Sequence, residues 1–121
     1  MSDLKPSTTD TDSLNLNWEH LHEISDGDAE FELELLQMFV EDAQIHVEAT
    51  KEAIANKDFR KLEQETHHLK GASANVGATP MQLAAQKLEQ QFHQQKIEGS
   101  SDLISQLEEF INRIQSFLAK Q

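Results

Sequence analysis

The chain has 121 residues, enough for one domain with one core, and no cysteine, which excludes disulfides, thiolate metal sites and cysteine nucleophiles. Its net charge of −12 arises entirely in residues 1–56, which hold fourteen acidic side chains and two lysines. No Lys/Arg stripe offsets this charge, which argues against nucleic acid or an anionic membrane as a partner. No apolar run approaches the roughly 18 residues of a membrane span, and the first residues lack a secretory signal, so we expect a cytoplasmic protein.

The chain is predicted to begin with a tail and a short helix. Residues 1–14 are rich in Ser, Thr and Asp and offer little to bury, so we expect them to be disordered. Apolar residues at i, i+3 and i+6 then predict a short helix over residues 18–24. Its apolar residues are Trp18, Leu21 and Ile24. The turn at residues 25–28 ends this helix and supplies an N-cap for the next one.

Two long amphipathic helices follow. Residues 29–56 contain no Gly or Pro, and their apolar positions recur at three- and four-residue steps. These positions are Leu35, Leu36, Phe39, Ala43, Val47, Thr50 and Ile54. The next helix is predicted to begin near Asp58 and to end at Gly77, a suitable C′ residue. Its core face comprises Phe59, Leu62, Thr66, Leu69, Ser73 and Val76.

The last two helices have clear starts. We expect Thr79 to cap the fourth helix, with Pro80 at its first position and Gln82 completing a capping box. Its apolar face comprises Met81, Ala84, Ala85, Leu88 and Phe92. The final helix is expected to follow residues 99–101, Gly-Ser-Ser. Its apolar residues are Leu103, Leu107, Phe110, Ile111, Ile114, Phe117 and Leu118.

This pattern predicts an all-α protein. No segment shows the strict alternation of a strand, and four long helices with short connections pack best as an antiparallel four-helix bundle, crossing at roughly 20°. We expect residues 15–121 to form this single domain. The short additional N-terminal helix would cover one end or one side of the bundle.

The third helix carries the candidate reactive residues. His67 lies roughly 140° from the core face of that helix, so its ring should project into solvent. Several residues share its side: Arg60, Glu63, Lys70, Gly71 and Ala74. His68 lies roughly 120° from the core direction on the other flank, near Lys61, Gln64 and Asn75.

Gly71 is the unusual residue of this helix. A glycine inside a helix costs about 1 kcal/mol relative to Ala, and this one sits one turn after His67. Its missing side chain leaves the imidazole open to a bulky partner, and Ala74 keeps the same face low. Lys70 places a cation where it would stabilise a transferring phosphoryl group. Neutral imidazole is a good nucleophile, with an ordinary pKa of about 6.5.

At these residues the sequence resembles the histidine phosphotransfer (HPt) family of multistep phosphorelays. The family pattern is approximately H-x-L-K-G-[AS]-[SA]-x-x-[LVI]-G-A, and residues 67–78 match every specified position. The departure is Thr66, where Ala is common. The resemblance covers most of residues 15–120.

The resemblance implies a phosphorelay intermediate. His67 would accept a phosphoryl group from an aspartate of a response-regulator receiver domain and pass it to an aspartate of another receiver. The implied partners are such receiver domains and a hybrid sensor histidine kinase, and the receiver would supply the Mg²⁺. The chain would bind no cofactor itself and would be a carrier without kinase or ATP-binding activity. The sequence has no Gly-rich phosphate loop.

Two assignments within this site need comparison. His67 is about 40° from Gly71 around the helix and His68 about 60°, and the family pattern also places the phosphoacceptor at His67. Glu89, on the fourth helix, is a weaker candidate. It would accept a hydrogen bond from His67 Nδ1 and leave Nε2 as the nucleophile. The alternative, which we favour from sequence alone, is an ordinary solvated glutamate.

The second helix carries another apolar stripe, formed by Phe31, Met38 and Ile45 at seven-residue spacing. Either the short helix or a neighbour in the bundle covers it, which we favour, or it is an exposed patch that docks the receiver. The family's docking surface surrounds the phosphoacceptor. The expected partner-binding residues are Arg60, Glu63, Gln64, His68, Ala74, Phe31, Met38 and Ile45.

The sequence also allows two functions other than the carrier role. The main rival is a helical interaction domain that has lost phosphotransfer, which the presence of His67 and Gly71 argues against. The second is a small metal- or ligand-binding bundle. Adjacent histidines diverge by about 100° on a helix, so His67 and His68 should not chelate one ion, and we expect no metal site.

The sequence also supports expectations about oligomeric state, chain organisation and the role of the acidic first half. The bundle should be monomeric, although the apolar stripe leaves dimerisation open. The initiating Met and the tail favour a free-standing protein over a piece of a hybrid kinase. The acidity of the first half is taken to provide solubility, the alternative being an acidic docking site.

Overall fold

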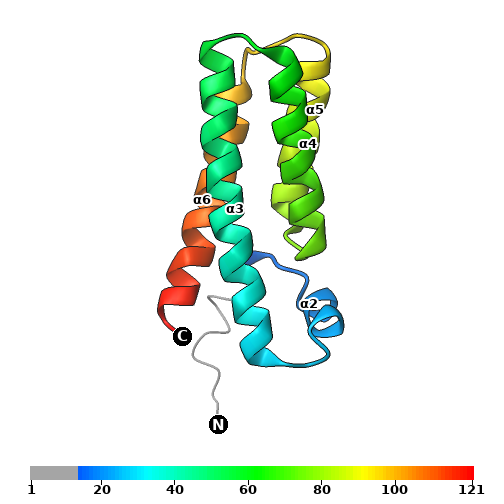
Figure 1. Ribbon diagram of the computed structural model, residues 1–121, viewed down its shortest axis with the longest axis vertical. Helices are drawn as coiled ribbons and strands as arrows, with labels where there is room; N and C mark the ends of the chain where they lie inside the picture. Colours follow the sequence, from blue (N-terminus) through cyan, green and yellow to red (C-terminus); the bar gives the residue numbers. More distant parts are fainter. Residues whose placement is uncertain (1–13) are drawn as a thin grey trace.

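Five helices make up most of residues 14–121, the part of the chain that the computed structural model describes. Labelled as in Figure 1, they are α2 (Trp18–Ile24), α3 (Ala29–Ala55), α4 (Phe59–Asn75), α5 (Thr79–His93) and α6 (Ser100–Ala119). Within the described range the only strand-like pairing is an isolated bridge between Leu16 and Ala78. The predicted all-α class is therefore confirmed. No helix in this range has the length and apolar character needed to cross a membrane.

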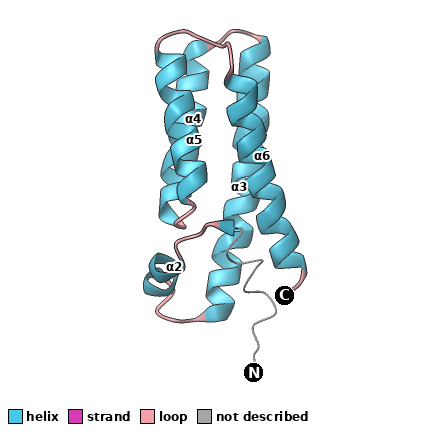
Figure 2. Ribbon diagram, turned by 180° about the vertical axis from the view of Figure 1, so that it is seen from behind, coloured by secondary structure: helices cyan, strands magenta, loops and turns pink. Residues whose placement is uncertain are grey.

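The four long helices form an antiparallel bundle with a square arrangement. α3 packs against α4 and α6, and α5 packs against the same two helices, whereas the diagonal pairs make no close contact among the described residues. The α3–α4 and α5–α6 connections lie together at one end of the bundle (Figure 1). Seen from behind, α3 extends beyond the α4–α5 turn to reach α2 at the other end (Figure 2). The short N-terminal helix thus lies at the end of the bundle.

The core faces of α4 and α5 follow the predicted spacing. In α4 the predicted residues Leu62, Thr66, Leu69 and Ser73 are fully buried. The Thr66 hydroxyl donates to the Leu62 carbonyl at 2.8 Å, which satisfies a polar group inside the core. In α5 all five predicted apolar residues are buried. These two helices bury one face each, so the residues of their opposite faces are left on the surface.

The buried face of α3 is broader than predicted. Val40 and Ala53 are fully buried in addition to the expected stripe, whereas Leu35 is only partly buried. Glu32 is buried too, at 5 % exposure. Its carboxylate is hydrogen-bonded by the imidazole of His22 and, at 2.8 Å, by the hydroxyl of Ser25. A buried carboxylate needs such partners, and these two attach α2 and its following turn to α3.

Two helix starts agree with the sequence and one does not. The side chains of Asp28 and Asp58 accept hydrogen bonds from backbone N–H groups three residues on, each at 3.1 Å, and so cap α3 and α4. The expected capping box at Thr79 is wrong. Ala78 is the N-cap of α5, Thr79 is already helical, and no side chain caps this end. The Ala78 carbonyl instead accepts from the N–H of Gln82 at 2.9 Å.

The segment before α2 is held against the α4–α5 turn. Leu14 and Leu16 are 2 % and 8 % exposed, and the N–H of Asn17 donates to the Gly77 carbonyl at 2.8 Å. Leu14 therefore belongs to the core, although its sequence context assigned it to the tail. The remaining residues of the predicted tail, 1–13, lie outside the described part of the chain.

Gly77, the predicted C′ residue of α4, is required by its surroundings. It has φ +73°, and a Cβ there would lie 2.9 Å from Cβ of Asn17 and 3.0 Å from the Asn17 carbonyl oxygen. Gly27 has a similar φ of +79° but no atom within 4 Å of the corresponding position. A side chain at Gly27 would therefore cause backbone strain alone, whereas one at Gly77 would cause both backbone strain and steric crowding.

We predict that Gly27→Ala lowers the free energy of unfolding by about 1 kcal/mol through left-handed strain alone. Gly77→Ala should lower it by at least about twice as much, because crowding against Asn17 is added. Urea unfolding followed by circular dichroism measures both. Equal losses in the two variants would show that the contact between Asn17 and the turn is not tight.

Candidate functional site

His67 projects from the outer face of α4. Its side chain is 69 % exposed, whereas the flanking residues Thr66 and Leu69 are fully buried. The burial of one helix face against α3 and α5 therefore turns the imidazole toward solvent, as the predicted helix geometry requires.

A carboxylate from the next helix holds this imidazole. Glu89 of α5 places Oε2 at 2.9 Å from Nδ1 of His67 and Oε1 at 2.7 Å from Nζ of Lys70. The Glu89 side chain is 24 % exposed, and that of Lys70 is 32 % exposed. One carboxylate thus bridges the histidine and the lysine. This contact replaces the solvated glutamate that the sequence alone favoured.

The pKa of Glu89 fixes the hydrogen-bond roles. Partial burial raises the pKa of its carboxyl group, but the hydrogen bonds and charges of Lys70 and His67 together outweigh that effect and hold the pKa below its ordinary value of 4.5. Glu89 is therefore ionised at neutral pH and can only accept hydrogen bonds. The hydrogen must lie on Nδ1 of His67, so Nε2 of the neutral imidazole carries the free lone pair.

Gly71 and Ala74 leave the region next to His67 low. A Cβ added at Gly71 would meet no atom within 4 Å, so packing inside the chain does not require glycine at this position. Gly71 is exposed and Ala74 is partly buried. Gly71, which the sequence marked as unusual inside a helix, therefore occupies an open position where a side chain would fit.

His68 belongs to a separate group of side chains. Its Nε2 lies 2.7 Å from Oδ2 of Asp42, and its ring stacks on that of His46 with the centroids 3.8 Å apart. Nδ1 of His46 lies 2.5 Å from Oε1 of Glu65. Sequence reasoning missed this cluster because it compared His68 only with His67. The i, i+4 spacing of Asp42 and His46 was the available signal.

The other expected partner-binding residues of α4 lie on the surface in different states. Arg60 and Gln64 are exposed. Glu63 is partly buried, and its Oε1 lies 2.8 Å from Nδ1 of His93 of α5. The structure thus places these residues along the outer side of α4, whereas the side chains joined to His67 are Glu89, directly, and Lys70, through Glu89.

The apolar stripe of α3 is exposed. Phe31, Met38 and Ile45 are 41 %, 64 % and 66 % exposed, so the expectation that α2 or a bundle neighbour covers them is wrong. The cause is that α2 lies at the end of the bundle rather than along this side of α3. All three residues lie within about 60° of Asp42 around the helix. Because Asp42 contacts His68, the stripe runs along the flank next to the α4 histidines.

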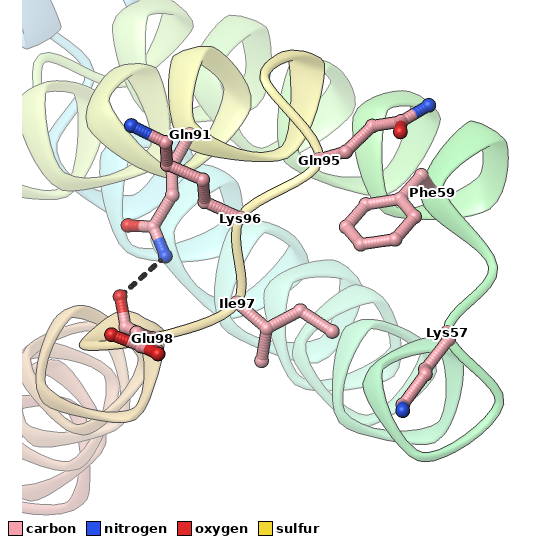
Figure 3. A pocket seen from close by; sticks show the side chains of 7 residues that line it. All are labelled: Lys57, Phe59, Gln91, Gln95, Lys96, Ile97 and Glu98. Atoms are coloured by element: carbon pink, nitrogen blue, oxygen red, sulfur yellow. Dashed lines mark hydrogen bonds between the residues drawn. The ribbon is translucent and has the colours of Figure 1, made fainter.

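A hollow at the end of the bundle is remote from His67. It lies where the α3–α4 and α5–α6 connections meet, and Gln91 there donates to the Glu98 carbonyl at 2.8 Å (Figure 3). Its lining residues are Lys57, Phe59, Gln91, Gln95, Lys96, Ile97 and Glu98. His67 is not among them, and its side chain, 69 % exposed, lies open to solvent. An exposed imidazole is accessible to a group carried on another protein.

Comparison with known proteins agrees with this geometry. The family model described as "Hpt domain" matches residues 34–117, a range that contains His67, Lys70, Gly71 and Glu89. No curated protein matches the chain in sequence.

Two solved structures share the fold. Histidine-containing phosphotransfer protein B (HptB) from Pseudomonas aeruginosa PAO1 superposes with a TM-score of 0.79 and 22 % identity, over 88 % of this chain and 92 % of that one. The HPT domain of a sensor hybrid histidine kinase from Shewanella gives a TM-score of 0.69 and 23 % identity over the same shares. At these identities the likeness establishes the helical bundle. With the family match over residues 34–117, the chain belongs to the Hpt domain family, whose members have a histidine phosphotransfer role in phosphorelays.

Proposed function

We propose that this chain is a phosphorelay intermediate in which Nε2 of His67 accepts a phosphoryl group from a receiver-domain aspartate and passes it to a second receiver. The observation that carries the proposal is the bridge from Glu89 to His67 and Lys70. Glu89 lies 2.9 Å from Nδ1 of His67 and 2.7 Å from Nζ of Lys70. This contact supports an exposed imidazole with its hydrogen on Nδ1 and with Nε2 free. An oriented neutral imidazole is the nucleophile that phosphoryl transfer from a carboxylate needs.

The transfer balances without a further reactant. The Nε2 lone pair attacks phosphorus, a N–P bond forms, and the bond from phosphorus to the receiver carboxylate breaks, which releases the aspartate as its anion. The ring then carries Nδ1–H and a positive charge, which the Glu89 carboxylate stabilises. The reverse reaction passes the group to the next aspartate. Release of the phosphoryl group restores the neutral ring.

The partner supplies what this chain lacks. The Mg²⁺ that such chemistry requires would be held by the receiver, where it would neutralise charge on the phosphoryl oxygens. The chain would act as a carrier without kinase or ATP-binding activity, taking its phosphoryl group from a hybrid sensor histidine kinase through that kinase's receiver. We further propose that it is a cytoplasmic monomer.

The receiver-docking face would combine the His67 side of α4 with the exposed stripe of α3. Its apolar part is supplied by Phe31, Met38 and Ile45, and isolated apolar residues of this size at helical spacing suit a partner helix. The polar part would come from Arg60, Glu63, Gln64, His68 and Ala74 around the histidine. Gly71 adds no side-chain atoms to this face, and the position of its missing Cβ has no atom within 4 Å.

The direct test incubates the protein with an aspartyl-phosphorylated receiver and Mg²⁺. Wild type and His68→Gln should acquire acid-labile, base-stable label, and His67→Gln should acquire none, because Nε2 of His67 is free beside an oriented Nδ1, whereas Nε2 of His68 faces Asp42. The matched pair of adjacent histidines controls for general loss of an imidazole.

Two results would count against the proposal. Label kept by His67→Gln but lost by His68→Gln would move the site to the neighbouring residue. Failure of several receivers to label any form would favour the rival function, an interaction domain without phosphotransfer.

The role of Glu89 is tested by Glu89→Gln. We expect phosphoryl transfer to fall by about tenfold or more, as when carboxylates that orient an imidazole are removed elsewhere. Because the pKa of Glu89 is lowered in the folded protein, its ionised form stabilises the fold above pH 4.5. That contribution is lost as the pH falls through the folded-state pKa.

The stability difference between wild type and Glu89→Gln should therefore be largest near neutral pH and shrink in acid. Urea titrations across the acid range measure it, with Glu63→Gln as the control for a carboxylate that contacts His93 instead. A difference that grows in acid would show that the pKa of Glu89 is not lowered.

Gly71 offers a test in which stability and function change in opposite directions. Gly71→Ala should raise the free energy of unfolding by about 1 kcal/mol, since the position is helical and open. Gly71→Leu should fold but transfer slowly, because its side chain lies one turn from His67 and obstructs the receiver. If Gly71→Leu transferred at the wild-type rate, the glycine would not be there to clear the approach.

A further inference from the structure

A second cluster of ionisable side chains lies beside His67 and is not used by the proposed transfer. Asp42 and His46 come from α3 and His68 from α4, and one potential ligand atom from each lies within 4.8 Å of the other two. His46 is partly buried, with a side chain 24 % exposed, whereas those of Asp42 and His68 are 39 % and 45 % exposed. The cluster is therefore partly buried at His46 and open to solvent at Asp42 and His68.

The spacing of these atoms is close to that of a metal coordination sphere. Nitrogen and oxygen ligands lie about 2.0–2.2 Å from Zn²⁺, which in a tetrahedron places them roughly 3.3–3.5 Å apart. Nε2 of His46 is 3.3 Å from Oδ1 of Asp42, which fits this range, whereas Nε2 of His68 is 2.7 Å from the other oxygen, Oδ2. Because the two rings stack with their centroids 3.8 Å apart, the exposed His68 ring must turn for both Nε2 atoms to face one ion.

The two ring nitrogens of His46 have different surroundings. Nδ1 is hydrogen-bonded to Glu65 at 2.5 Å, and Nε2 lies 3.3 Å from Oδ1 of Asp42. A neutral imidazole carries one hydrogen and can donate to only one partner. When Nδ1 donates to Glu65, the lone pair of Nε2 is available to a metal ion. A carboxylate on Nδ1 with the metal on Nε2 is the arrangement that orients metal-bound histidines.

We propose that Asp42, His46 and His68 form a binding site for a divalent transition-metal ion of the zinc class, with Glu65 positioning His46. Two imidazoles and one carboxylate suit Zn²⁺, which accepts three protein ligands and a water molecule. Mg²⁺ and Ca²⁺ prefer oxygen ligands and fit this set less well. The excess negative charge of residues 1–56, which include Asp42 and His46, also favours a cation there.

The site would share a surface with the reactive histidine. His68 directly follows His67 in α4, and it belongs to the face that the proposed function assigns to the receiver. An ion held by His68 would therefore compete with a docked receiver for that side chain. This consequence rests on the proposed function, whereas binding of the ion does not.

Calorimetric titration of the full chain with zinc chloride, in a buffer that does not chelate metals and without a receiver, tests the proposal. We expect saturable binding of one ion per chain. His46→Gln and His68→Gln should each weaken it by at least about tenfold, and Glu65→Gln by about tenfold. His93→Gln is the matched control, because it removes an exposed histidine that faces a carboxylate outside the cluster. The His93→Gln and His67→Gln variants, tested separately, should each bind zinc like wild type.

Absence of saturable zinc binding by the wild type would overturn the proposal. Equal affinities in His68→Gln and His93→Gln would also overturn it, because zinc would then bind elsewhere. Circular dichroism of each variant verifies that it is folded. Since no receiver is present, failure here leaves the phosphotransfer assay unaffected, and the reverse also holds.

Discussion

The packing of α4 between α3 and α5 determines the chemistry of this protein. It buries Leu62, Thr66, Leu69 and Ser73, and the burial of that face leaves His67 on the opposite side of the helix in solvent. The same packing brings Glu89 of α5 to Nδ1 of the exposed ring at 2.9 Å. Exposure and orientation of the His67 imidazole thus have one physical cause, the burial of apolar area in the bundle.

The divergence of successive side chains on a helix gives two adjacent histidines different environments. His67 faces α5 and contacts Glu89, which also binds Lys70, whereas His68 faces α3 and contacts Asp42 and His46. The first group leaves Nε2 of His67 free, and the second places Nε2 of His68 against a carboxylate. The roles that we propose for these two neighbouring residues, phosphoryl transfer and ion binding, therefore use different partners.

Much of the fold and part of the site followed from the sequence, because they depend on local periodicity. The helix bounds, the core faces of α4 and α5, and the outward direction of His67 all rest on the 3.6-residue repeat. What depends on the relative placement of helices did not follow. The position of α2 left the Phe31, Met38 and Ile45 stripe exposed, and the α3–α4 register brought His46 onto His68. Buried Glu32 was missed for the same reason, since its partners His22 and Ser25 lie before α3.

In the proposed function Glu89 holds the hydrogen of His67 on Nδ1 and leaves Nε2 to react. Long-range ¹H–¹⁵N NMR of the imidazole rings, recorded before and after phosphorylation by a receiver, would show where the hydrogen and the phosphoryl group lie. We expect a protonated Nδ1 and a bare Nε2 in the free protein, and a phosphoryl group on Nε2 after transfer. A hydrogen on Nε2 in the free ring, or a phosphoryl group on Nδ1, would contradict it.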